Sequence, residues 1–214
     1  MNYSAMNYSP LRITVGIVIL AALAIWDFVD KGREATRWKE YAFLAFCVVV
    51  AVVYGMGNDL ITSRISWEYF YYGKELSPIL GADVPPDPGK LSLQAIRIGA
   101  AATWWAGLIV GAAILIANNP SRRGLRLSYK RLAMRLPVVV GITILWAIIL
   151  GFAGANYDLN WISADFQTLA ETNLCRPHRY MAVYGIHLGG YIGGALAAVY
   201  AVASIVRERR TSIG

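Results

Sequence analysis

The stretch LPVVVGITILWAIILGFAGA at residues 136–155 decides the fold class, because it contains no charged side chain. A helix rises about 1.5 Å per residue, so about 20 residues cross a hydrocarbon core about 30 Å thick. Four other apolar blocks of similar length lie at residues 11–29, 41–60, 93–117 and 181–206. The sequence therefore predicts an all-α polytopic membrane bundle, a single domain over residues 1–214 with five transmembrane helices.

The composition agrees with this prediction. Of the 214 residues, 57% are hydrophobic and 15% are charged, whereas soluble domains have about 45–50% and about 25%. These fractions exclude an ordinary soluble domain and a disordered chain. The formal net charge is +7.

The basic residues predict the orientation of the chain. Three segments between or after the apolar blocks are rich in lysine and arginine: Lys31, Arg33, Arg37, Lys39, Arg122, Arg123, Arg126, Lys130, Arg131, Arg135, Arg207, Arg209 and Arg210. These are thirteen of the twenty basic residues. By the positive-inside rule their side is cytoplasmic, which places the N-terminus outside and the C-terminus inside. Residues 61–92 and 156–180 then form the outer loops of a multi-pass protein of the cell (inner) membrane.

The positive charge is thus a signal of orientation, and we expect no nucleic-acid partner, since no basic patch alternates with stacking aromatic residues. The expected partners are the lipid bilayer and either further copies of the chain or other membrane-protein subunits.

Acidic residues near a span are informative, because an acid at mid-bilayer costs about 2.5–3.5 kcal/mol. If the second helix continues outward, Asp59, Thr62 and Ser66 share one face, and residues 67–72 add an aromatic cluster. Two interpretations are open. The segment is either an aromatic belt at the membrane interface or part of a polar site.

The second interpretation gains support because polar groups of other spans end at the same depth. We expect an outward-facing ligand or ion pocket formed by these residues: Asp59, Glu68, Arg97, Trp104, Trp105, Tyr157, Asp158 and His187. Arg97 is the expected counter-ion of Asp59 or Glu68, because an unpaired charge at that depth is expensive.

The last span has glycines at every fourth position, Gly185, Gly189 and Gly193. Such a stripe lets helices approach closely, so we expect it to be a packing face, with a dimer contact as one use. His187 on the same span is either a hydrogen-bonded structural histidine or a group that relays protons or binds metal.

The sequence gives no sign of a metal site or a catalytic motif. Cys175 and His178 have a spacing that two metal ligands could use, but a structural zinc requires four. No Walker loop, paired-histidine zinc motif, nucleophile elbow or Rossmann fingerprint occurs. We therefore predict no metal and no catalytic residue, and the sequence names no cofactor.

The segment from Asn58 to Lys74 resembles a group of bacterial multispanning membrane proteins, together with Ala102, Thr103, Trp104, Trp105 and Gly107. That group shows an Asp and a Thr, then Glu-Tyr-Phe, then Ala-Thr-Trp-Trp-x-Gly on the next span. Many members have His before the Asp, where this chain has Asn58. No function is attached to the group. The resemblance therefore supports Asp59, Glu68, Trp104 and Trp105 as candidate site residues, but it does not assign their chemistry.

Two functions remain open at this point. The first is a membrane protein that handles a small solute, an ion or a proton at the outward-facing polar site. The alternative is a non-catalytic accessory or structural subunit that docks on a larger membrane complex.

Overall fold

The computed structural model describes residues 9–32, 35, 37–119, 126–156 and 174–211, which fold entirely into helices and short connections. Five long helices account for most of this chain: α2 (Ser9–Lys31), α3 (Arg37–Ile65), α5 (Pro88–Asn118), α7 (Leu136–Asn156) and α9 (Pro177–Thr211). Three short elements connect them: the π-helical turn η2 (Tyr69–Gly73), α4 (Ser77–Leu80) and α6 (Tyr129–Ala133).

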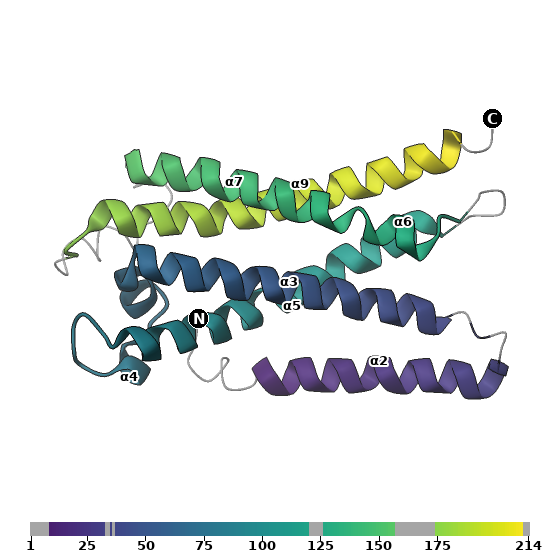
Figure 1. Ribbon diagram of the computed structural model, residues 1–214, viewed down its shortest axis with the longest axis horizontal. Coiled ribbons are helices and arrows are strands. Elements are labelled where there is room, and N and C mark those ends of the chain that lie inside the picture. The colour runs from purple at the N-terminus through teal and green to yellow at the C-terminus, as the bar shows by residue number, and fades with distance from the viewer. Residues whose placement is uncertain (1–8, 33–34, 36, 120–125, 157–173, 212–214) are drawn as a thin grey trace.

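The long helices form two tightly packed pairs, α3 with α5 and α7 with α9, and contacts between the pairs are much sparser. α2 lies along α3 at the edge of the bundle (Figure 1). We call the end that carries η2 and α4 the α4 end, and the opposite end the α6 end. The α4 end corresponds to the predicted outer side.

Small residues hold each pair together. A methyl group built on Gly55 of α3 or on Gly99 of α5 would overlap the backbone of the other helix. In the second pair, Gly185 and Gly189 lie against the backbone of α7 in the same way. Glycine permits this close approach of two backbones. The glycine stripe of the last span is therefore occupied by α7 of the same chain.

Four of the five predicted spans correspond to helices long and apolar enough to cross a membrane, within the described residues. These segments are 37–65, 88–118, 129–156 and 177–211. α2 has 23 residues, which is sufficient length, but its last turns carry Asp27, Asp30 and Lys31. The chain is thus a helical membrane bundle with four candidate spans, and the fifth span remains a prediction.

Asp27 near the end of α2 fixes the start of the next helix. Its carboxylate accepts hydrogen bonds from the backbone N–H of Arg37, at 2.8 Å, and of Trp38, at 3.3 Å. Lys31 lies 3.4 Å from the same carboxylate. The charges of α2 thus stabilise the α2–α3 connection, because a carboxylate satisfies N–H groups that a helix start leaves free.

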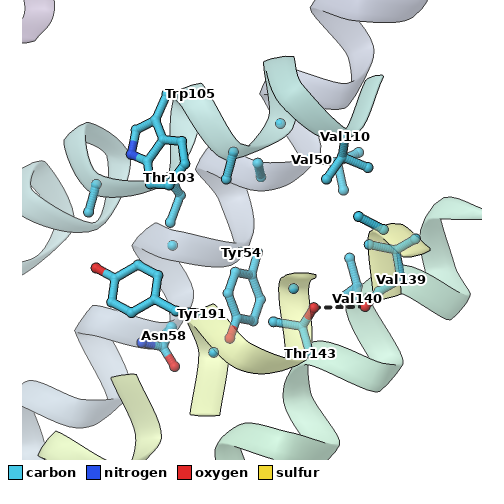
Figure 2. A pocket seen from close by; sticks show the side chains of 18 of the residues that line it. Val50, Tyr54, Asn58, Thr103, Trp105, Val110, Val139, Val140, Thr143 and Tyr191 are labelled. Atoms are coloured by element: carbon cyan, nitrogen blue, oxygen red, sulfur yellow. Dashed lines mark hydrogen bonds between the residues drawn. The ribbon is translucent and has the colours of Figure 1, made fainter. Parts of the chain in front are cut away.

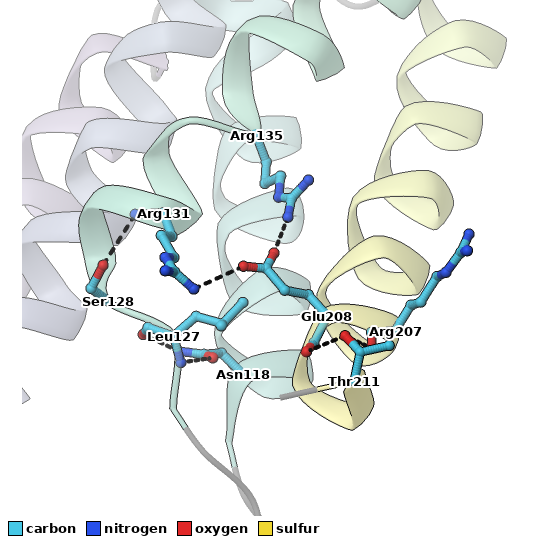
Figure 3. A network of polar contacts seen from close by, with 8 residues as sticks. All are labelled: Asn118, Leu127, Ser128, Arg131, Arg135, Arg207, Glu208 and Thr211. Atoms are coloured by element: carbon cyan, nitrogen blue, oxygen red, sulfur yellow. Dashed lines mark hydrogen bonds and ion pairs between the residues drawn. The ribbon is translucent and has the colours of Figure 1, made fainter. Parts of the chain in front are cut away.

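Polar contacts join the helices at the α6 end, where the predicted cytoplasmic cations lie (Figure 3). Glu208 of α9 pairs with Arg131, at 3.1 Å, and with Arg135. The Asn118 side chain pairs with the backbone of Leu127, accepting from its N–H at 2.9 Å and donating to its carbonyl at 3.0 Å. These contacts connect α5 to the segment before α6, and α9 to α6 and to the residue before α7.

Candidate functional site

The aromatic residues that follow α3 lie largely inside the protein. Within η2, Phe70 is 0% exposed, and Tyr69 and Tyr71 are also buried. They pack with Leu91 of α5 and Tyr180 of α9 in the hydrophobic core of the α4 end. These three side chains therefore form a packed layer over the ends of α3, α5 and α9.

His187 of α9 lies beneath this aromatic layer. Its ring stacks on Tyr69, with centroids 4.9 Å apart and planes 20° apart, and Phe70 meets its edge at 6.2 Å. Its Nε2 atom lies 3.4 Å from the hydroxyl of Thr62 and 3.8 Å from a carboxylate oxygen of Asp59. One face of the imidazole is thus fixed by an aromatic ring, while its nitrogen faces polar groups of α3.

Asp59 lies on α3 and is 3% exposed. Asn58 donates a hydrogen bond to its Oδ1 atom at 3.1 Å, and this is the same oxygen that faces His187. Thr62 donates to the carbonyl of Asn58 at 2.9 Å, which holds its hydroxyl next to the histidine. The pair is ionic only when the imidazole carries a proton, so the attraction between the two side chains depends on the protonation of His187.

Glu68 contacts the backbone at the start of α9. Its carboxylate accepts hydrogen bonds from the backbone N–H of Cys175, at 2.6 Å, and of Arg176, at 3.2 Å. These two residues immediately precede α9, whose N-terminus carries partial positive charge. Glu68 is 1% exposed, and it attaches the segment after α3 to the start of α9.

Lys74 and Tyr69 form the outer part of the layer. The Lys74 ammonium lies 5.4 Å from the centroid of the Tyr69 ring, within the range of a cation–π contact. Burial lowers the pKa of Lys74, and the charge of Asp59 acts in the opposite direction. Burial also raises the pKa of the Tyr69 phenol well above its ordinary value, so this tyrosine stays neutral at physiological pH.

A cavity of about 300 Å³ lies between the two helix pairs, and Asp59 and His187 form part of its wall. All four helices of the two pairs contribute side chains to it (Figure 2). On α3 the lining residues include Cys47, Ala51, Tyr54 and Asn58, which recur at helical spacing on one face. The cavity thus lies along the boundary between the two helix pairs, where the helices contact each other less than they do within a pair.

The structure brings together some of the predicted pocket residues. Asp59, Trp105 and His187 line the cavity, whereas Glu68 and Trp104 do not. Tyr157 and Asp158 lie outside the described residues.

The predicted counter-ion contact of Arg97 is not formed. Arg97 is exposed on α5, and neither Asp59 nor Glu68, both described, pairs with it. Asp59 faces His187 instead, and Glu68 faces the backbone N–H groups before α9. The physical reason is rotation about the helix axis: Gln94 and Ile98, on either side of Arg97, point inward, which directs Arg97 outward.

Several polar residues line the cavity but were not among the pocket residues predicted from the sequence. They are Tyr54, Asn58, Thr103, Thr143 and Tyr191. A signal for two of them was present. Tyr191 lies one helical turn after His187, and Asn58 adjoins Asp59. No comparable spacing indicated Thr143, because it lies alone in the most apolar span.

Among the described residues, no group of three or more His, Cys, Asp or Glu side chains is arranged to hold a metal ion. Comparison with known proteins finds no matching family model, no matching curated protein and no matching solved structure.

Proposed function

We propose that this membrane protein handles a small solute, an ion or a proton at a polar site centred on Asp59 and His187. The observation that supports the proposal is the approach of these two side chains to 3.8 Å across the seam between helix pairs. Both also line the cavity, so the pair is within reach of a ligand.

The cost of the pair supports a functional role. An acid within a span costs about 2.5–3.5 kcal/mol, and such residues commonly mark pathways of ions, protons or substrates. Apolar side chains of similar volume would pack the same seam at no such cost. An imidazole and a carboxylate are both groups that can take up and release a proton, and a cation or a hydrogen-bond donor can replace the histidine at the carboxylate.

Infrared difference spectroscopy tests this proposal on protein in lipid nanodiscs. We expect acidification to produce a carboxyl band that Asp59→Asn removes and that His187→Gln shifts. Asp83→Asn is the matched control, because Asp83 is exposed in the loop before α5, and we expect it to leave this band unchanged. A spectrum from which Asp59→Asn removes no band would contradict the proposal.

A subunit role is the second proposal, and α2 favours it. This helix packs mainly on α3 and exposes large apolar side chains, with Trp26 72% and Val29 78% exposed. A partner helix could cover this face. Purification from native membranes tests the idea: a stoichiometric partner should accompany the wild type and be lost in Trp26→Ala/Val29→Ala. Lipid alone covers the face if no partner is found.

We further propose that α2 is a fifth span and that the chain lies in the bacterial inner membrane with its C-terminus in the cytoplasm. The support is the length of α2 and the concentration of basic residues at the α6 end, including Arg131, Arg135 and Arg209. With this orientation the Asp59–His187 pair lies in the outer half of the membrane.

A further inference from the structure

The cavity between the helix pairs has two chemically distinct parts. Near the α4 end its wall carries polar groups, among them Tyr54, Asn58, Asp59, His187 and Tyr191. Toward the α6 end the wall becomes aliphatic. Figure 2 shows the labelled valines of this part on the right of the view, away from Tyr191 and Asn58: Val50, Val110, Val139 and Val140. A ligand that fills both parts must be amphipathic.

The cavity also reaches the lateral surface of the bundle. Several lining residues are exposed on the outside of α5 and α9: Trp105 is 44%, Ile109 is 57% and Tyr191 is 51% exposed. These positions lie within two of the candidate spans, so in a membrane this side faces lipid. A molecule dissolved in the bilayer can enter directly, whereas a hydrated solute would have to cross hydrocarbon to take the same route.

The charge of the wall restricts the head of the ligand. Among the described residues that line the cavity, none is a lysine or an arginine, and Asp59 is the acid. A phosphate or carboxylate head would find no lysine or arginine in the wall and would face the Asp59 carboxylate. A hydroxyl head can donate to Asp59 and accept from a tyrosine hydroxyl, such as that of Tyr54 or Tyr191.

We propose that the cavity binds a neutral, membrane-soluble amphiphile, with a hydroxyl-bearing head at Asp59 and His187 and a hydrocarbon tail along the aliphatic wall. This inference rests on the proposed function, because it names the class of small molecule for the same site. The volume of about 300 Å³ is at the lower end of the range for ligand pockets, about 300–1,000 Å³. The rest of the tail extends between α5 and α9 into the lipid.

Photo-crosslinking tests the inference, with hexadecanol that carries a diazirine in its chain as the probe. The same chain with a carboxylic acid head is the comparison probe. In nanodiscs, we expect the alcohol to label wild-type peptides that contain Val110 or Val139 several-fold more than the acid does. Equal labelling by the two probes would overturn the inference, because it would mean that the head is not recognised.

Two variants on one helix test the position of the tail. Ala198 lines the cavity, so Ala198→Phe fills the aliphatic part and should reduce alcohol labelling several-fold. Ala203 is exposed on the same helix and is not among the lining residues, so Ala203→Phe should label like the wild type. Labelling that Ala198→Phe leaves unchanged, or that both variants reduce equally, would contradict the inference.

The variant Asp59→Asn tests recognition of the head without changing the volume of the cavity. It should lower alcohol labelling and raise acid labelling, because it removes the negative charge. If Ala198→Phe fails to fold, the labelling of Asp59→Asn by the two probes still tests the inference. The infrared band of Asp59 should persist in Ala203→Phe whatever the probe results, so a failure of the amphiphile inference can be told apart from a failure of the proposed polar site.

Discussion

At the scale of the residue, the site depends on pairings between distant parts of the chain. Asp59 meets His187, and Glu68 meets the backbone at Cys175 and Arg176. Each contact joins the segment that contains α3 and η2 to α9. The polar side chains near α3 therefore contribute to the attachment of one helix pair to the other.

The first prediction concerns the coupling of Asp59 with His187. His187→Phe retains a ring that can stack on Tyr69 but removes the nitrogen that faces the carboxylate. In a double-mutant cycle with Asp59→Asn, we expect a coupling free energy of about 0.5–3 kcal/mol, measured by unfolding in mixed micelles. The same cycle with Asp83→Asn should give no coupling. An additive result for Asp59 and His187 would mean that they do not interact.

The second prediction concerns Glu68. Glu68→Gln removes the negative charge from the start of α9 and should lower the free energy of unfolding by about 1–2 kcal/mol. Thermal unfolding in detergent measures this change. Glu75→Gln is the control, because Glu75 is exposed beyond the same turn. Equal effects of the two variants would show that the attachment of Glu68 to α9 contributes no stability.

At the scale of the element, glycines set the distance between paired helices. Gly55 and Gly99 place the backbones of α3 and α5 in contact, and Gly185 of α9 packs against the backbone of α7 in the same way. The paired helices leave no room for a side chain at these positions. Since polar residues of α3 lie on both sides of Gly55, the spacing of this pair also positions the cavity wall.

The third prediction follows from this close contact. Gly55→Ala should destabilise the protein by about 1–3 kcal/mol, because the added methyl overlaps the backbone of α5. Gly57→Ala is a matched control two residues away, where no atom lies within 4 Å of the added methyl. Alanine there should be neutral or should stabilise the helix by about 0.5–1 kcal/mol. Thermal unfolding of both variants distinguishes packing from helix propensity, and equal stability would refute the close contact.

At the scale of the whole molecule, the two ends differ in chemistry. The α4 end contains a buried acid, a histidine stacked on Tyr69 and a layer of aromatic rings. The α6 end carries ion pairs, with Glu208 between Arg131 and Arg135. This difference agrees with the charge asymmetry of the sequence, and it gives the proposed orientation a direct test.

The fourth prediction concerns topology. In intact cells, an impermeant thiol reagent should label wild-type Cys175, which is exposed near the α4 end. Lys130→Cys in a Cys175→Ser background should be labelled only after the membrane is opened. Ser9→Cys in the same background should be labelled in intact cells if α2 is a fifth span. Labelling of Lys130→Cys from outside would reverse the orientation, and protection of Ser9→Cys would show that α2 does not cross.

The helices themselves could be predicted from the sequence, because hydrophobicity and length are local properties of a segment. Residues 136–155 were predicted as a span, and α7 is Leu136–Asn156. The boundaries of other helices extend beyond the apolar blocks, since polar turns continue a helix once it has formed. At α5, Asp87 caps the first turn by accepting from the N–H of Lys90 at 2.8 Å.

The sequence by itself determined that the chain is a helical membrane protein and that thirteen of its twenty basic residues fall in the segments on one side of the spans. Only the tertiary structure decided which polar side chains meet. It placed His187 rather than Arg97 beside Asp59. It also placed the Glu68 carboxylate against the backbone N–H groups before α9, and it formed a cavity whose wall includes Tyr54 and Thr143. The physical reason is that the rotation of each helix about its axis is set by the packing of small residues within each pair. That packing brings together side chains more than a hundred residues apart in the chain.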